Sequence, residues 1–191
     1  MLFIKGKDFN TQLRIIFLIE MKFNFKGLIV LALILVFVIS FGCTSTLSDK
    51  GALDEFSTLK QKYFANDSLP TNNALLNDYI SDLSALRGKS SGSAGKVIEA
   101  ELYFAQTFYY LNDSLSNAAG IDIENMLCSS TGVKNTITSA NLANDYCQKA
   151  ITAIGTLSDN EKTYLSAGAV NAIDGYKSRI SQIKAFFEKK C

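Results

Sequence analysis

Four cysteines, at positions 43, 128, 147 and 191, are the residues whose type and spacing most suggest covalent chemistry in this chain. They lie too far apart for the close ligand pairs of a zinc site, and the chain contains no histidine, the commonest metal ligand. We therefore expect no metal site and no bound cofactor. The chemistry left to these thiols is modification of single side chains and disulfide formation.

The missing histidine also removes the usual general base, so neither a Ser-His-Asp nor a Cys-His constellation can be assembled. Acidic residues such as Glu99 and Glu101 are two positions apart and do not share a helix face. Glycines precede Lys96, but Val97 follows it where a phosphate-binding loop has Ser or Thr. We expect no catalytic residue and interpret the chain as a protein that is not an enzyme.

An apolar segment precedes the first cysteine. Lys22 and Lys26 form a basic head, and a run from Leu28 to Phe41 follows, interrupted only by Ser40. A basic head, an apolar core and a small-residue exit are typical of a secretory signal. As a helix the run would span roughly 21 Å, short of the roughly 30 Å hydrocarbon core of a bilayer. A cleaved signal is therefore favoured over a permanent anchor.

Gly42-Cys43, followed by Thr44-Ser45-Thr46, resembles the lipobox of prokaryotic lipoproteins, including the looser boxes of archaeal ones. The resemblance covers only the signal segment, and it departs from the usual Leu and small residue at positions 40 and 41. It implies that Cys43 is lipidated and holds the mature chain on the extracytoplasmic face of the cell membrane. Retention of the hydrophobic helix as a single-pass anchor and ordinary secretion remain alternatives.

These features divide the chain into four parts. Residues 1–20 read as an upstream extension, with translation expected to start at Met21, and residues 21–42 form the signal peptide or anchor. Residues 43–50 are polar and small, as in a tether. Residues 51–191 form the extracytoplasmic helical domain, a length that suits one domain.

The composition of that domain favours an all-α fold. Proline occurs once, at Pro70, and no turn signals separate short alternating strands. We expect a bundle of five to six helices behind the N-terminal hydrophobic signal or anchor helix. The spacing of apolar residues predicts helices over residues 52–65, 71–88, 96–111, 121–128, 134–157 and 158–187.

Three details refine this prediction. The helix over 96–111 is apolar on most faces and is expected to be the central element. The Gly/Ser-rich residues 89–95 are expected to form a flexible connection. Ser158 and Glu161 are placed to form a capping box at the start of the last helix.

The predicted helices also suggest a cysteine pairing. If the helices over 134–157 and 158–187 pack antiparallel, Cys191 comes to lie beside the segment that carries Cys128. An extracytoplasmic location permits disulfides. We therefore predict a Cys128–Cys191 bond, with Cys147 as a buried apolar thiol.

Four tyrosines are candidates for a binding groove: Tyr103, Tyr109, Tyr110 and Tyr164. Such a groove could take a peptide, a glycan or a small solute. The alternative is that these aromatic residues, at helical spacing, simply belong to the core.

Asn66 and Asn112 each begin an Asn-Asp-Ser triplet, the acceptor pattern for glycosylation, in segments expected to be helix-to-loop turns. The stretch 63–69 matches 109–115, which indicates either a duplicated helical hairpin or a shared way of ending a helix.

The predicted function is that of an interaction or scaffold module of the cell envelope, tethered to the membrane and in contact with an envelope protein. The alternative is a lipoprotein that binds a ligand in the aromatic groove. A nucleic-acid partner is not expected, because 19 basic and 18 acidic residues nearly balance and form no basic cluster.

Overall fold

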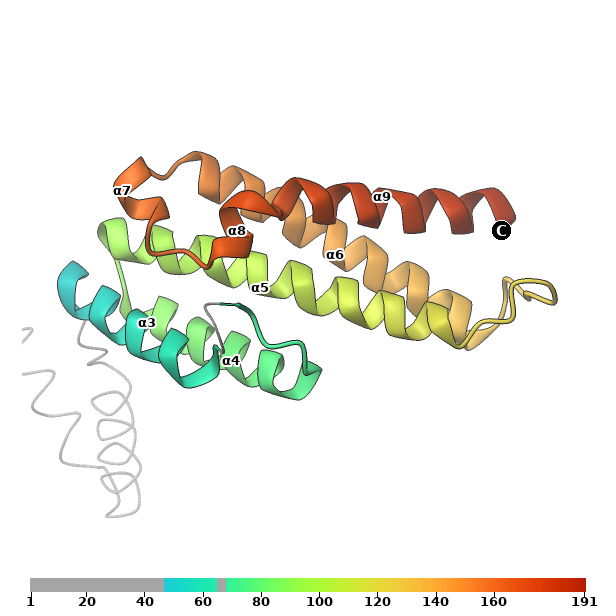
Figure 1. The fold of residues 1–191 in the computed structure, drawn as a ribbon, viewed down its shortest axis with the longest axis horizontal. Coiled ribbons are helices and arrows are strands. Elements are labelled where there is room, and N and C mark those ends of the chain that lie inside the picture. Colours follow the sequence, from blue (N-terminus) through green and yellow to red (C-terminus); the bar gives the residue numbers. More distant parts are fainter. Residues whose placement is uncertain (1–46, 65–67) are drawn as a thin grey trace, which may run out of the picture. The chain divides into compact units, whose positions relative to one another are not determined.

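The computed structural model describes residues 47–64 and 68–191, and the expected all-α architecture is confirmed there (Figure 1). The signal segment, Cys43 and Asn66 lie outside the described residues. Among the described residues, no helix combines the length and the hydrophobicity that a membrane span requires. The helices are α3 (Asp49–Tyr63), α4 (Asn73–Lys89), α5 (Gly92–Ala119), α6 (Thr131–Gly155), α7 (Asp159–Lys162), α8 (Ala167–Asn171) and α9 (Ile173–Lys190).

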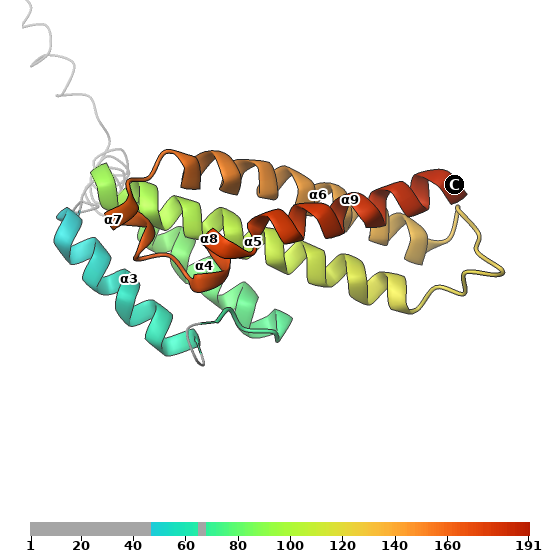
Figure 2. The same ribbon diagram turned by 45° about the horizontal axis from the view of Figure 1, so that its top comes forward.

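Helix α5 is the central element, as its apolar composition predicts. It packs against α6 along most of its length, while α3 and α4 cover its first half (Figures 1 and 2). Helix α9 packs mainly on α6 and makes a smaller contact with α5. The large side chains of α5 that are fully or almost fully buried include Val97, Ile98, Phe104 and Leu111.

Residue size explains why the contact between α5 and α6 is the most extensive one. The buried face of α6 carries small side chains at alternating spacings of three and four, among them Ala140, Ala143, Cys147 and Ala150. Small residues on one helix let the backbone of its neighbour approach closely and receive its larger side chains. Helix α9 contributes larger anchors at seven-residue intervals: Ile173, Ile180 and Phe187.

The expected end of the central helix is wrong. Residues 112–114 do not form a turn, because α5 continues to Ala119. The buried Ser114 hydroxyl donates to the Thr136 carbonyl of α6 (3.0 Å), and the Asp113 carboxylate accepts from the Ser139 hydroxyl (2.5 Å). These bonds to α6 engage the polar groups that would otherwise favour a turn. Asn112 therefore lies within a helix, and the match between 63–69 and 109–115 does not reflect a shared helix ending.

The connection between α4 and α5 is shorter than the expected flexible segment 89–95. Only Ser90 and Ser91 separate the two helices, and α5 begins at Gly92, whose φ of +59° suits glycine. The Asp49 carboxylate accepts a hydrogen bond from the Ser93 backbone N–H (3.3 Å). A carboxylate is favourable at the positive end of a helix dipole, so α3 helps to fix the start of α5.

The expected last helix is divided into α7, α8 and α9. The predicted capping box at its start is confirmed, with Ser158 and Glu161 bonded in both directions. Beyond α7, the Lys60 ammonium donates to the carbonyls of Tyr164 (3.1 Å) and Leu165 (3.3 Å). The Glu101 carboxylate accepts from the Ser166 backbone N–H (3.0 Å). These distant side chains satisfy the backbone groups that the interruption of the helix leaves unpaired.

The Glu161 carboxylate also links α7 to α5, because it accepts a hydrogen bond from the Ser93 hydroxyl. The hydrogen bond from the Ser93 hydroxyl, followed by those from Ser158, lowers the pKa of Glu161 from 4.5 to about 2. Its contribution to stability is therefore present above pH 4.5 and is lost as the pH falls toward 2. In a carboxyl-carbon NMR titration, Ser93→Ala should move the Glu161 midpoint back toward 4.5. The matched variant Ser181→Ala, on the exposed side of α9, should not move it, and an unchanged midpoint in Ser93→Ala would contradict the assignment.

Candidate functional site

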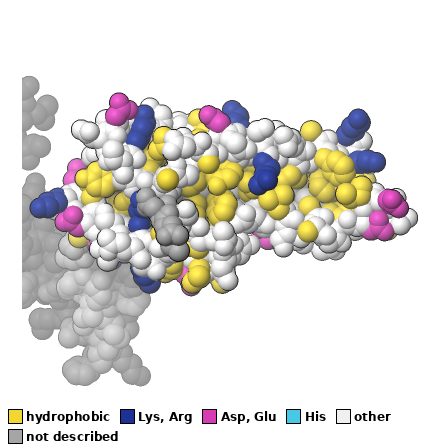
Figure 3. Space-filling model, in the orientation of Figure 1, with side chains coloured by type: hydrophobic (Ala, Val, Ile, Leu, Met, Phe, Trp, Pro, Cys, Tyr) yellow, Lys and Arg dark blue, Asp and Glu magenta, His cyan; other side chains and the backbone are white. Residues whose placement is uncertain are grey.

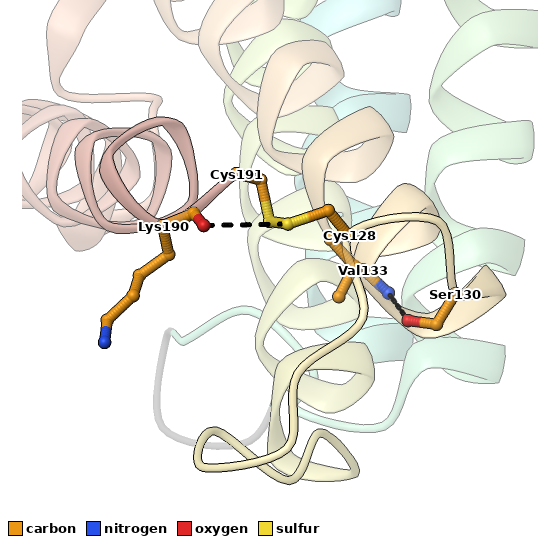
Figure 4. The surroundings of a disulfide bond; sticks show 5 residues. All are labelled: Cys128, Ser130, Val133, Lys190 and Cys191. Atoms are coloured by element: carbon orange, nitrogen blue, oxygen red, sulfur yellow. Dashed lines mark hydrogen bonds between the residues drawn. A yellow bond between two sulfur atoms is a disulfide. The ribbon is translucent and has the colours of Figure 1, made fainter.

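The strongest candidate site is the end of the bundle where a disulfide joins the loop before α6 to the C-terminal end of α9. Cys128 precedes α6 and Cys191 follows α9, and their sulfur atoms are 2.09 Å apart (Figure 4). The Cα atoms are 5.4 Å apart, within the usual range for a bonded pair. The predicted pairing is confirmed, and so is its basis, the packing of α9 along α6. Cys147 is the buried free thiol that the sequence indicates, and burial raises its pKa.

The loop before α6 is ordered by local bonds rather than by the short helix expected over 121–128. The Asp122 carboxylate accepts from the backbone N–H groups of Glu124 (3.0 Å) and Asn125 (3.4 Å) and from the Asn125 side chain (2.9 Å). These bonds lower the pKa of Asp122. An aspartate that bonds the backbone two residues ahead forms a turn in competition with a helix. The loop then ends at Ser130, whose hydroxyl caps α6.

Large apolar side chains remain exposed around this disulfide. Ile123 is 56% exposed and Leu127 is 69% exposed in the loop, and Phe186 of α9 is 37% exposed. Charged residues of both signs, including Glu124 and Lys190, lie in the same two segments, and Figure 3 shows this mixture at the end of the bundle where α9 finishes. We call residues 121–130 and 186–191 the disulfide end. Apolar side chains with a charged rim are typical of a protein-binding surface.

The first described residue lies at the opposite end of α5. The Leu47 backbone N–H donates to the Lys89 carbonyl (2.9 Å), just before α5 begins. The disulfide lies beyond the end of α5, whose 28 residues span about 42 Å at about 1.5 Å per residue. Leu47 therefore lies about 40 Å from the disulfide end.

The four candidate tyrosines do not line one groove. Tyr103 and Tyr110 of α5 flank Tyr146 of α6, with ring centroids 6.4 Å and 5.6 Å from its ring, and Tyr109 meets Tyr110 edge-on. Tyr164 instead lines a separate cavity with residues of α3. Tyr146 could not be identified as part of this group from the sequence, because it lies on α6 and no sequence pattern connects it with Tyr103 on α5.

The tyrosines of α5 and α6 are in contact with a lysine ammonium group and with a glutamate carboxylate. The Lys149 ammonium lies 4.9 Å from the Tyr146 ring centroid, and the Tyr103 hydroxyl donates to Glu99 (3.0 Å). The same hydrogen bond is the main cause that raises the pKa of Tyr103. Glu99 is itself paired with Arg87 at 2.8 Å. This arrangement engages the polar groups with one another, so we interpret it as a structural contact between α4, α5 and α6.

Glu101 is the most deeply buried carboxyl group among the described residues. Its side chain accepts from the Tyr79 hydroxyl (3.3 Å) and from the Ser166 backbone N–H (3.0 Å). Burial raises its pKa, and the hydrogen bonds and the charge of Lys60 act in the opposite direction. The described residues contain no group of three acidic or cysteine side chains suited to hold a metal ion. Glu101 therefore joins α4, α5 and the segment before α8.

The comparisons with known proteins do not assign the chain to a family. No family model matches it, and no curated protein or solved structure is significantly similar to it.

Proposed function

We propose that this chain is a membrane-tethered, extracytoplasmic interaction module that binds a protein of the cell envelope through its disulfide end. One observation carries the proposal. The disulfide clamps together two segments that carry exposed apolar side chains, Leu127 and Phe186 among them. A rigid apolar surface of this kind loses little conformational entropy when it binds a partner.

The proposed location draws on the signal segment and on the cysteines. The run before Cys43 resembles a lipoprotein signal, and disulfides persist in oxidising compartments outside the cytoplasm. Lipidation at Cys43 would place the tether on the side of residue 47. The disulfide end would then extend about 40 Å from the attachment point, within reach of a neighbouring envelope protein.

A photoreactive amino acid placed at Leu127 in living cells tests this function. We expect one dominant protein adduct from position 127 and none from Asn160, an exposed matched control that lies near the start of α5. Equal labelling from both positions, or no adduct from position 127, would contradict the proposal.

A second experiment tests whether the captured protein binds through the exposed apolar side chains of the disulfide end. With the purified partner, Leu127→Asp should weaken binding at least about tenfold, because it places a charge where an apolar side chain is desolvated. Asn160→Asp should leave the affinity unchanged. Leu127 is 69% exposed, so we expect its substitution to change the free energy of unfolding by less than about 0.5 kcal/mol.

A further inference from the structure

A groove with polar walls lies between the first half of α5 and the last part of α6, which run side by side (Figures 1 and 2). Its volume is about 440 Å³, within the range of roughly 300–1,000 Å³ that is typical of small-molecule sites. The residues that matter for its chemistry are Lys96, Glu99 and Tyr103 of α5 and Gln148, Lys149 and Thr152 of α6.

The groove has an excess of positive charge. The exposed ammonium groups of Lys96 and Lys149 form no ion pair with a carboxylate of the described residues. The Glu99 carboxylate is held by the Arg87 guanidinium, at 2.8 Å and 3.1 Å from two of its nitrogens. The Glu161 carboxylate, whose charge interacts with that of Lys96, accepts hydrogen bonds from two serine hydroxyls. The nearby carboxylates are thus engaged elsewhere, and an anion would be attracted to the two lysines.

Two tyrosine rings position one of these ammonium groups. The Lys149 ammonium lies 4.9 Å from the ring centroid of Tyr146 and 5.9 Å from that of Tyr103. An aromatic ring attracts a cation without neutralising its charge, so the ammonium group can still pair with an anion. Because the side chain is already held in place, less conformational entropy is lost when a ligand binds.

We propose that this groove binds a small hydroxylated anion, of the size of a monosaccharide, that carries one carboxylate or phosphate group. The anionic group pairs with the ammonium groups of Lys96 and Lys149. The hydroxyl groups of the ligand form hydrogen bonds with the exposed Gln148 amide and Thr152 hydroxyl. The groove lies near the start of α5, and the disulfide lies beyond its end, so this inference does not depend on the function proposed for the disulfide end.

The test is saturation-transfer NMR of the full chain in nanodiscs of a zwitterionic lipid, with empty nanodiscs as the blank. The probes are glucuronate, which carries a carboxylate, glucose 6-phosphate, which carries a phosphate, and glucose, which is neutral. We expect saturable binding of at least one of the two anions and at least about tenfold weaker binding of glucose. The anion that binds more tightly identifies the anionic group that the groove selects.

Substitution of the lysines tests where the anion binds. Lys96→Met and Lys149→Met each remove a charge but retain a long side chain, so each should weaken binding of the anion about tenfold. Lys134→Met, which removes an exposed lysine of α6 that does not line the groove, is the matched control and should bind like the wild type. Circular dichroism verifies that each variant is folded.

Two results would overturn the proposal. The first is that neither anion binds saturably, or that glucose binds as tightly as the anions, because the groove would then not select a negative charge. The second is binding that survives both Lys96→Met and Lys149→Met, because the anion would then lie elsewhere on the protein.

Discussion

Replacing Cys128 and Cys191 together with serine is expected to lower the free energy of unfolding by about 4 kcal/mol. The bond joins residues 63 positions apart, and a cross-link of that span removes much of the conformational freedom of the unfolded chain. Urea unfolding under oxidising conditions measures the difference. Both cysteines are changed at once so that no single free thiol remains to form bonds between molecules.

Two comparisons isolate the contribution of the bond. The wild type in the presence of a reductant should match the double variant, whereas Cys147→Ala should keep its sensitivity to the reductant, because the Cys147 thiol is buried and unpaired. Equal stability of the oxidised wild type and the double variant would show that the bond does not constrain the domain.

Glu101→Ala is expected to destabilise the domain by about 3–5 kcal/mol. The substitution removes the acceptor of two buried donors, the Tyr79 hydroxyl and the Ser166 backbone N–H, and it leaves a cavity. Glu101→Gln retains one acceptor oxygen and nearly the same volume, so we expect a loss of about 1–2 kcal/mol. A smaller effect for alanine than for glutamine would contradict this role.

The pH dependence of the same residue provides a second measurement. Burial raises the pKa of Glu101 above its ordinary value of 4.5, so the folded state retains a proton that the unfolded state releases. Its contribution to stability is therefore full below about pH 4.5 and declines as the pH rises through the folded-state pKa. The urea midpoints of the wild type and of Glu101→Gln are measured between pH 4 and 8. The difference between the two midpoints reports the contribution of the Glu101 carboxyl group, and we expect this difference to decrease as the pH rises. A difference that is flat or rises with pH would contradict the sign.

Much of the fold could be predicted from the sequence because apolar spacing reports which helix faces are buried. The cysteine pairing followed from assuming that the last two helices pack antiparallel about the turn near Leu157 and Ser158, and the structure has both the packing of α9 on α6 and the bond. The capping box of Ser158 and Glu161 is also local, since three residues contain the whole pattern.

The errors arose where a polar residue acts over a long sequence separation. Asp113 and Ser114 signal a turn locally, but their partners on α6 keep them within α5. The break before α8 depends on Lys60 and Glu101, which are remote from it in sequence.

The lipid tether and the disulfide are tested most directly by the intact mass of the protein from the native membrane fraction, measured with and without reductant. We expect a chain that starts at Cys43 and carries added lipid mass, and that gains two hydrogen atoms on reduction because one disulfide opens. A chain that starts at Met21 or Met1 without lipid would contradict the lipid tether. A mass unchanged by reductant would contradict the disulfide that holds the proposed binding surface together.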